Sequence, residues 1–302
     1  MAGKDKKNMK FSAVRLCAAS ILLIFFLSCQ SAPNISDTSW ENMTHAPLEK
    51  GGFVYIFGNA RQSLPILDLL QIEELKDRQV RQIAERTKNF TAALFPEANG
   101  RYFQLAAWGN YPSARGFLAL NTNRHWERQQ SVNGQYWYSE VNGLSIAMTS
   151  NRVFAVSSIK NTPLDPVTMP GTQIPEGFLE FSRKYPFSCW LENPAPVFFK
   201  VLNDLGFPVQ VPVRQFFFSL YPAQKAEHYE AVIRIQFENQ QQARALASLL
   251  NLASGISSNI SNSLIASIFF TNPPVQNGNL IDINTAALNE TELQRLFGMF
   301  LF

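Results

Sequence analysis

The pattern of hydrophobic and polar positions opens with a cationic segment that leads into an uncharged, apolar run. Lys and Arg dominate residues 1–15, and residues 16–27 carry no charge. At 12 residues, the run lies within the roughly 7–15 of a signal-peptide core and is shorter than the ~20 that a transmembrane helix needs. The pattern therefore predicts a secretion signal over 1–28, and a permanent transmembrane helix is the weaker interpretation.

A polar stretch separates this signal from the rest of the chain. Residues 29–50 are rich in Ser, Asn, Thr, Pro and charged side chains, which predicts a flexible tether that spans about 25 Å, at roughly 5–6 Å × √n. The remaining residues are numerous enough to bury a sizeable core. Three prolines and no periodicity mark residues 160–173 as a linker, which divides the folded part into an N-terminal half, 51–159, and a C-terminal half, 174–302.

Strand-like and helix-like patterns alternate in the N-terminal half. We expect a strand over 53–57, helices over 63–70 and 72–94, a strand over 102–108, a helix over 113–120 and a β-meander over 136–158. The long helix rests on apolar residues that recur near a 3.6-residue period, from Ile72 to Leu94. In the meander, Asn142-Gly143 is typical of a two-residue type I′ turn between strands over 136–141 and 144–148.

The C-terminal half repeats this strand–turn–helix opening. We expect strands over 187–191, 216–221, 231–237 and 280–283, and helices over 197–205, 240–253, 264–270 and the end of the chain. Asn239 can cap the second of these helices, and Asn289 to Glu292 forms a capping box for the last. The fold class is therefore α+β, with two packed halves that we interpret as divergent duplicates. The second half has the ferredoxin-like order βαββαβ plus a C-terminal helix.

The residues at the end of the signal carry the strongest indication of chemistry in the sequence. Phe26-Leu27-Ser28-Cys29 places a small residue and a cysteine directly after the apolar run. This resembles the lipobox of bacterial lipoproteins, although most such boxes carry Leu where Phe26 stands. The resemblance implies cleavage between Ser28 and Cys29 and lipid attachment at Cys29. Two or more buried acyl chains hold a protein stably on a membrane.

Signal, tether and paired halves together resemble uncharacterised exported lipoproteins of spirochaetes. This resemblance implies a membrane-anchored protein of the cell envelope that faces the periplasm or the cell surface, and it leaves the activity open. Removal of residues 1–28 takes away five of the 26 basic and one of the 23 acidic residues, which leaves 21 against 22. Because this balance is near neutral, nothing indicates nucleic-acid binding.

Candidate catalytic and metal-binding residues are few. His45, His125 and His228 lie far apart, and no His or Cys pair has a metal-ligand spacing. Ser157-Ser158-Ile159-Lys160 matches Ser-x-x-Lys but lacks the partner motifs of penicillin-interacting enzymes. Cys189 has no partner for a disulfide once Cys29 carries lipid, and we expect it to pack in a buried strand. We therefore expect no cofactor, no metal and no enzymatic activity.

Aromatic residues are the remaining signal, because they crowd between residues 102 and 138. Trp108, Tyr136, Trp137 and Tyr138 are the candidate ligand-binding residues, since alternation along a strand places Tyr136 and Tyr138 on one face and Trp137 on the other. Core packing is the favoured interpretation, with Tyr136 and Tyr138 facing the core. An apolar groove or docking surface is the alternative. The sequence thus predicts a non-enzymatic binding or assembly module for an envelope partner. A carrier or sensor of an apolar ligand such as lipid is the runner-up, and an envelope hydrolase is third.

Overall fold

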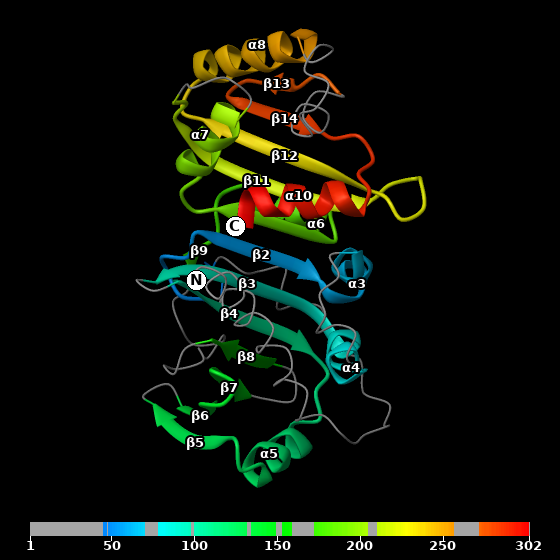
Figure 1. Ribbon diagram of the computed structural model, residues 1–302. Coiled ribbons are helices and arrows are strands. Elements are labelled where there is room, and N and C mark those ends of the chain that lie inside the picture. The colour runs from blue at the N-terminus through cyan, green and yellow to red at the C-terminus, as the bar shows by residue number, and fades with distance from the viewer. Residues whose placement is uncertain are drawn as a thin grey trace, which may run out of the picture. The chain divides into compact units, whose positions relative to one another are not determined.

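The computed structural model divides the protein into two compact units (Figure 1). It describes residues 45–46, 48–69, 78–97, 100–131, 134–148, 153–158, 172–204, 210–256 and 272–301. The first unit comprises the chain up to Gly52 and Phe57–Ile174, and the second comprises Phe53–Ile56 and Pro175–Phe302. The predicted signal with Cys29, the helix over 264–270 and most of the linker lie outside the described residues. Helices combined with antiparallel sheet confirm the α+β class.

The sheet of the first unit has the order β2-β3-β4-β8-β7-β6-β5, and the pairs from β3 to β5 are antiparallel. A separate pair joins β1 to β9. The elements are β1 (His45–Ala46), β2 (Val54–Asn59), α3 (Ala60–Leu69), α4 (Arg78–Arg86), β3 (Thr87–Glu97), β4 (Gly100–Gly109), α5 (Ser113–Thr122), β5 (Glu127–Ser131), β6 (Gly134–Ser139), β7 (Leu144–Met148), β8 (Val153–Ser157) and β9 (Thr172–Gln173).

The predicted helix over 72–94 is wrong in its second half, because α4 ends at Arg86 and residues from Thr87 form β3. Thr91, Ala93 and Phe95 alternate as buried residues along β3, which is the two-residue period of a strand. Pairing with β4 supplies the tertiary contacts that override the weaker helical periodicity. Gly109, at the end of β4, fits closely here, because a Cβ on it would lie 2.2 Å from the Arg86 carbonyl oxygen.

The turn at Asn142-Gly143 exists, but it is not the two-residue turn that the sequence predicts. Ser139 pairs with Leu144, so the loop has four residues, 140–143. Within it the Gly143 N–H donates to the Glu140 carbonyl oxygen, and Gly143 has φ +62°. Four-residue hairpin loops are most often built around a type I turn. Here the positive φ of Gly143 favours glycine at the end of the loop.

The second unit contains a sheet of order β13-β14-β12-β11-β10-β2, in which the pairs from β13 to β10 are antiparallel. Phe53–Ile56 belongs here, since the Glu192 N–H donates to the Phe53 carbonyl oxygen and Tyr55 stacks on Trp190. Helix α8 packs on β12, β13 and β14, and α7 on β11 (Figure 1). The elements are α6 (Phe178–Arg183), β10 (Phe187–Leu191), α7 (Ala195–Asp204), β11 (Val213–Pro222), β12 (Tyr229–Phe237), α8 (Gln240–Ile256), β13 (Val275–Asn277), β14 (Leu280–Asn284) and α10 (Glu290–Leu301).

The succession of elements that suggested a ferredoxin-like half is present, but the strand arrangement differs. A ferredoxin-like sheet inserts a third strand between the two that a βαβ unit connects. Here β10 and β11 pair directly and antiparallel, with Leu191 opposite Phe216, although α7 lies between them in the sequence. The helical excursion therefore begins and ends at the same end of the sheet, and β10, β11 and β12 lie side by side in chain order.

Two helix caps are confirmed. The Asn239 Oδ1 accepts the Gln242 N–H at 3.0 Å. At the start of α10, Asn289 Oδ1 accepts the Glu292 N–H at 3.1 Å, and the Glu292 carboxylate accepts the Asn289 N–H at 2.8 Å. This reciprocal pair is the capping box that the sequence predicts.

The ends of the predicted tether and linker are ordered rather than free. Ala46 pairs with Thr172, and His45 pairs with Gln173. Leu48 is buried, and its carbonyl oxygen accepts the Thr172 N–H. The composition of both segments concealed this contact, because main-chain hydrogen bonds hold it together and neither segment shows an apolar period.

Candidate functional site

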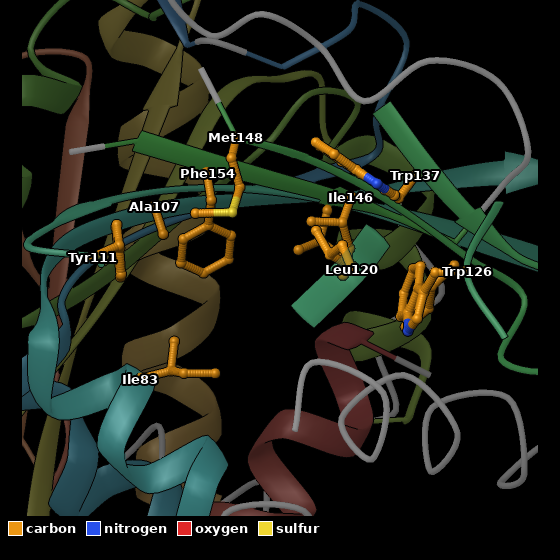
Figure 2. Close-up of a cluster of buried hydrophobic side chains, with 11 residues drawn as sticks. Ile83, Ala107, Tyr111, Leu120, Trp126, Trp137, Ile146, Met148 and Phe154 are labelled. Carbon is orange, nitrogen blue, oxygen red and sulfur yellow. The ribbon is translucent and has the colours of Figure 1, made fainter. Parts of the chain in front are cut away.

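The aromatic stretch is divided between two faces of the first unit's sheet. Trp137 belongs to a core cluster that includes Tyr111, Trp126 and Phe154, and its side chain is 0% exposed. Figure 2 shows the cluster running from Tyr111 and Ile83 at one end to Trp126 and Trp137 at the other. Core packing is therefore the role of Trp137, which removes it from the candidate ligand-binding residues.

Helix α5 closes the core over Trp137. The Trp137 indole N–H donates to Asn121 Oδ1 at 2.9 Å, and the Phe117 ring lies 5.1 Å from the Trp137 ring between centroids. The indole thus has a polar partner, as a buried Trp requires. The indole nitrogen of Trp126, in the same cluster, is buried and without a hydrogen-bond partner among the described residues.

Tyr136 and Tyr138 lie on the opposite face, because adjacent residues of a strand point to opposite sides. Both are half-buried, as is Trp108 on β4. The register joins Tyr138 to Ser145, Ser145 to Ser157, and Ser157 to Gln104, and residues directly opposite each other share a face. The two tyrosines therefore lie outside the core cluster around Trp137, and their packing against a core on their own face stays a prediction. Three of the four candidate residues share one face, and we name it the tyrosine face.

The middle of the tyrosine face is made of small and polar side chains, and the register also places Phe95, Tyr102 and Val153 on this face. Between β6 and β3, two adjacent rows cross the sheet and contain only Ala, Ser, Thr and Gln, and every member is buried at 4% exposure or less. Because every member is buried, other parts of the chain cover these rows. The members are Thr91, Ala93, Gln104, Ala106, Ser145, Ala147, Ala155 and Ser157.

Two side-chain atoms in these rows are buried and have no hydrogen-bond partner in the described part of the chain, Thr91 Oγ1 and Gln104 Nε2. Thr91 lies opposite Ala106 and Gln104 opposite Ala93, so the two are diagonal neighbours on adjacent strands, with Cα atoms about 7–8 Å apart. The other end of the Gln104 carboxamide is engaged, since its Oε1 accepts the Glu49 N–H at 3.0 Å. A buried polar atom without a partner costs about 1–3 kcal/mol.

The arm formed by His45, Ala46, Leu48 and Glu49 is attached at the Gln104 end of this face. Besides the bond to Gln104, the Glu49 carboxylate accepts the Tyr102 hydroxyl at 3.3 Å. The Glu49 carbonyl oxygen accepts the Thr172 hydroxyl at 3.0 Å. Three segments far apart in the sequence therefore meet here. Sequence reasoning missed this junction, because its only apolar signal is the single residue Leu48.

The other candidates for chemistry are dispersed. His45 is in β1, and His125 and His228 are in loops. Ser157 ends β8 as a buried residue, and Ser158 Oγ accepts the Phe103 N–H at 2.9 Å, which is a structural role. Cys189 is buried in β10, as expected, and burial raises the pKa of its thiol to about 12. Among the described residues, no group of three or more His, Cys, Asp or Glu could hold a metal ion.

The second unit carries a polar cluster that the sequence did not reveal. Arg234, in an otherwise apolar part of β12, donates from Nε and Nη2 to both carboxylate oxygens of Asp282, each at 2.8 Å. Its guanidinium lies 5.3 Å above the Phe181 ring. The hydrogen bonds to Asp282 raise the Arg234 pKa. Nearby on the strand pair, Tyr221 donates to Glu230, and burial raises the Tyr221 pKa to about 12. These residues satisfy one another's hydrogen-bonding groups, so we interpret the cluster as a surface network that stabilises the fold.

Comparisons with known proteins show the fold. The chain is similar to TP0453, a protein of the spirochaete Treponema pallidum, in three crystal forms at 15% sequence identity. The TM-scores are 0.56, 0.54 and 0.55, and the matches cover 85%, 83% and 86% of this chain and 97%, 96% and 98% of the solved chains. No family model matches the sequence, and no curated protein matches it. The predicted resemblance to spirochaete proteins thus agrees with a fold that this chain shares with one spirochaete protein.

None of the helices in the described ranges is long and apolar enough to cross a membrane.

Proposed function

We propose that the protein is a cell-envelope lipoprotein, anchored to a membrane by lipid on Cys29, and that its folded part is a non-enzymatic binding or assembly module. The anchor is supported by the residues Phe26 to Cys29 after the apolar run. The fold shared with a spirochaete protein is consistent with this origin. The mature chain would face the periplasm or the cell surface.

The observation that carries the binding role is the placement of Tyr136 and Tyr138. Trp137 completes the core on one face of β6, while the two tyrosines are half-buried on the other, beside rows of small side chains. Tyrosine presents a large, rigid apolar ring with a polar tip, which suits it to binding surfaces. The partner would be an envelope protein that contacts the tyrosine face.

The anchor is tested by acyl labelling. Cys29→Ala should abolish incorporation of a labelled fatty acid and partitioning into the detergent phase, because no other cysteine follows the signal directly. Cys189→Ala is the matched control and should label as the parent does, since Cys189 is buried in a strand. Persistent labelling of Cys29→Ala would remove the lipoprotein assignment.

The binding role is tested by site-specific photo-crosslinking in the envelope. A benzoylphenylalanine at Tyr138 keeps an aromatic ring on the tyrosine face, and the same residue at Leu118, which is 64% exposed on α5, is the control. We expect a discrete protein adduct from position 138 and none from position 118. An adduct with lipid alone would favour the carrier of an apolar ligand, and identical patterns from both positions would contradict a site on this face.

A further inference from the structure

The arm, defined above as His45, Ala46, Leu48 and Glu49, is bound chiefly through its main chain. Its strand β1 pairs with β9, the Leu48 carbonyl oxygen accepts the Thr172 N–H at 3.1 Å, and the Glu49 N–H donates to Gln104. One apolar anchor accompanies these bonds, since Leu48 is 1% exposed. Main-chain hydrogen bonds combined with alternate side-chain anchors are the way in which proteins bind extended peptides. The arm therefore occupies a binding site for an extended segment.

The partners of the arm are remote in the sequence. Gln104 lies 55 residues beyond Glu49, and Thr172 lies 123 residues beyond it. Since the contacts described above join residues remote in the sequence, the arm of a second copy would make every one of these contacts equally well. Identity of sequence makes a second copy the occupant that fits the site best.

The connection from the arm to β2 is short and can reverse direction. Lys50 and Gly51 form an exposed turn, and Gly51 has φ +92° with no atom within 4 Å of the place where a Cβ would lie. The hinge is short, because only Gly52 and Phe53 separate this turn from β2, which begins at Val54. Short hinges favour exchange of a terminal element between copies over its return to the same copy.

We propose that two copies of this chain exchange their arms, so that β1 of each copy pairs with β9 of the other. The exchanged contacts are those seen within one chain, so exchange costs only hinge opening and association. A high local concentration offsets that cost. The inference does not depend on lipid at Cys29, although copies held on one membrane would be concentrated together.

A disulfide that can form only between chains tests the exchange. The full chain is prepared in detergent with Cys17, Cys29 and Cys189 replaced by alanine, once as a tagged His45→Cys variant and once as an untagged Gln173→Cys variant. These positions are direct partners in the β1–β9 register, and facing residues of paired strands are within the Cα distance of a disulfide. The two variants are mixed, partly unfolded, refolded over a range of concentrations and oxidised.

Exchange predicts a disulfide-linked heterodimer that increases with protein concentration. Its yield should be about tenfold above that of a matched mixture in which Glu176→Cys, also exposed, replaces Gln173→Cys. The double variant with both cysteines in one chain should close as monomer when diluted, which checks the register. Heterodimer no higher than the Glu176→Cys mixture at every concentration would overturn the proposal, and so would a double variant that closes in neither form.

Discussion

The indole nitrogen of Trp137 on β6 lies 2.9 Å from the Oδ1 of Asn121 on α5. This hydrogen bond joins a fully buried side chain to the last turn of the helix that covers it. It fixes how α5 sits on the sheet, because an indole has a single donor and only one orientation satisfies it. The packing of the aromatic core therefore depends on a polar contact as well as on the volumes of its side chains.

We expect Trp137→Phe and Asn121→Ala each to lower the free energy of unfolding, and the double variant to lose less than the sum. Each single change removes the same hydrogen bond, and such bonds contribute about 0.5–1.5 kcal/mol. The coupling energy from urea denaturation of all four proteins should fall in that range. Losses that add fully would show that the contact contributes nothing of its own.

The two faces of β6 should respond differently to truncation. Trp137→Ala empties a fully buried site and should cost about 3–5 kcal/mol. Tyr136→Ala and Tyr138→Ala remove half-buried rings and should cost clearly less, with retention of the fold. Thermal unfolding checks this order, at roughly 2–4 °C for each kcal/mol in a chain of this size. Equal losses for all three variants would place the tyrosines in the core after all.

Local sequence patterns predicted much of the fold because interactions between residues close in the sequence determine many of its helices and strands. The capping box at Asn289 and the cap at Asn239 follow from hydrogen bonds within one helical turn. The strands around Cys189 and Ile233 follow from apolar runs and alternation. The predicted helix over 72–94 is wrong from Thr87 onward, because a long-range contact decides the structure there. Residues such as Phe90 and Leu94 fit both periods, and only pairing with β4, a tertiary contact, decides between them.

The candidate site was predicted in part. Alternation correctly separated Trp137 from Tyr136 and Tyr138, but it could not tell which face carries the aromatic cluster. That choice depends on the helices that cover the sheet, and α5 reaches Trp137 through Asn121, whose side chain gives no apolar signal. The arm at Leu48 escaped prediction because main-chain atoms make most of its contacts, and every sequence has these.

Thr91 and Thr87 on β3 form a matched pair of buried hydroxyls. Thr87 Oγ1 donates to the Ile83 carbonyl oxygen at 2.8 Å and lies 2.9 Å from the Tyr111 hydroxyl, whereas Thr91 Oγ1 has no partner in the described part of the chain. Thr91→Val, which keeps the shape, should leave the free energy of unfolding unchanged or raise it by up to about 1–2 kcal/mol. Thr87→Val should lower it by about 1–3 kcal/mol.

Chemical denaturation of the two valine variants beside the parent provides the measurement. A loss in Thr91→Val as large as that in Thr87→Val would mean that the Thr91 hydroxyl has a hydrogen-bond partner in solution.

The thiol of Cys189 should make stability depend on alkaline pH. Burial in β10 raises its pKa from an ordinary value of 9.0 to about 12 in the folded protein. Between these values the unfolded chain releases the thiol proton while the folded chain keeps it, so the unfolded state gains stability as the pH rises. The contribution of the thiol is thus complete below pH 9 and declines steadily toward pH 12.

The direction of this pH dependence can be measured by comparing the parent with Cys189→Ala, both carrying Cys29→Ala. The contributions of all other titrating groups then cancel in the difference between the two proteins. The alanine variant lacks the thiol and its titration, so the difference in unfolding free energy between the two proteins should shrink as the pH is raised from 8 to 11. In the folded parent at pH 8, a thiol reagent should react with Cys189 only as fast as the protein opens, since the side chain is buried and protonated. A difference that stays constant with pH, together with rapid labelling of the folded protein, would mean that Cys189 is accessible and that β10 packs more loosely than its neighbours in the sheet.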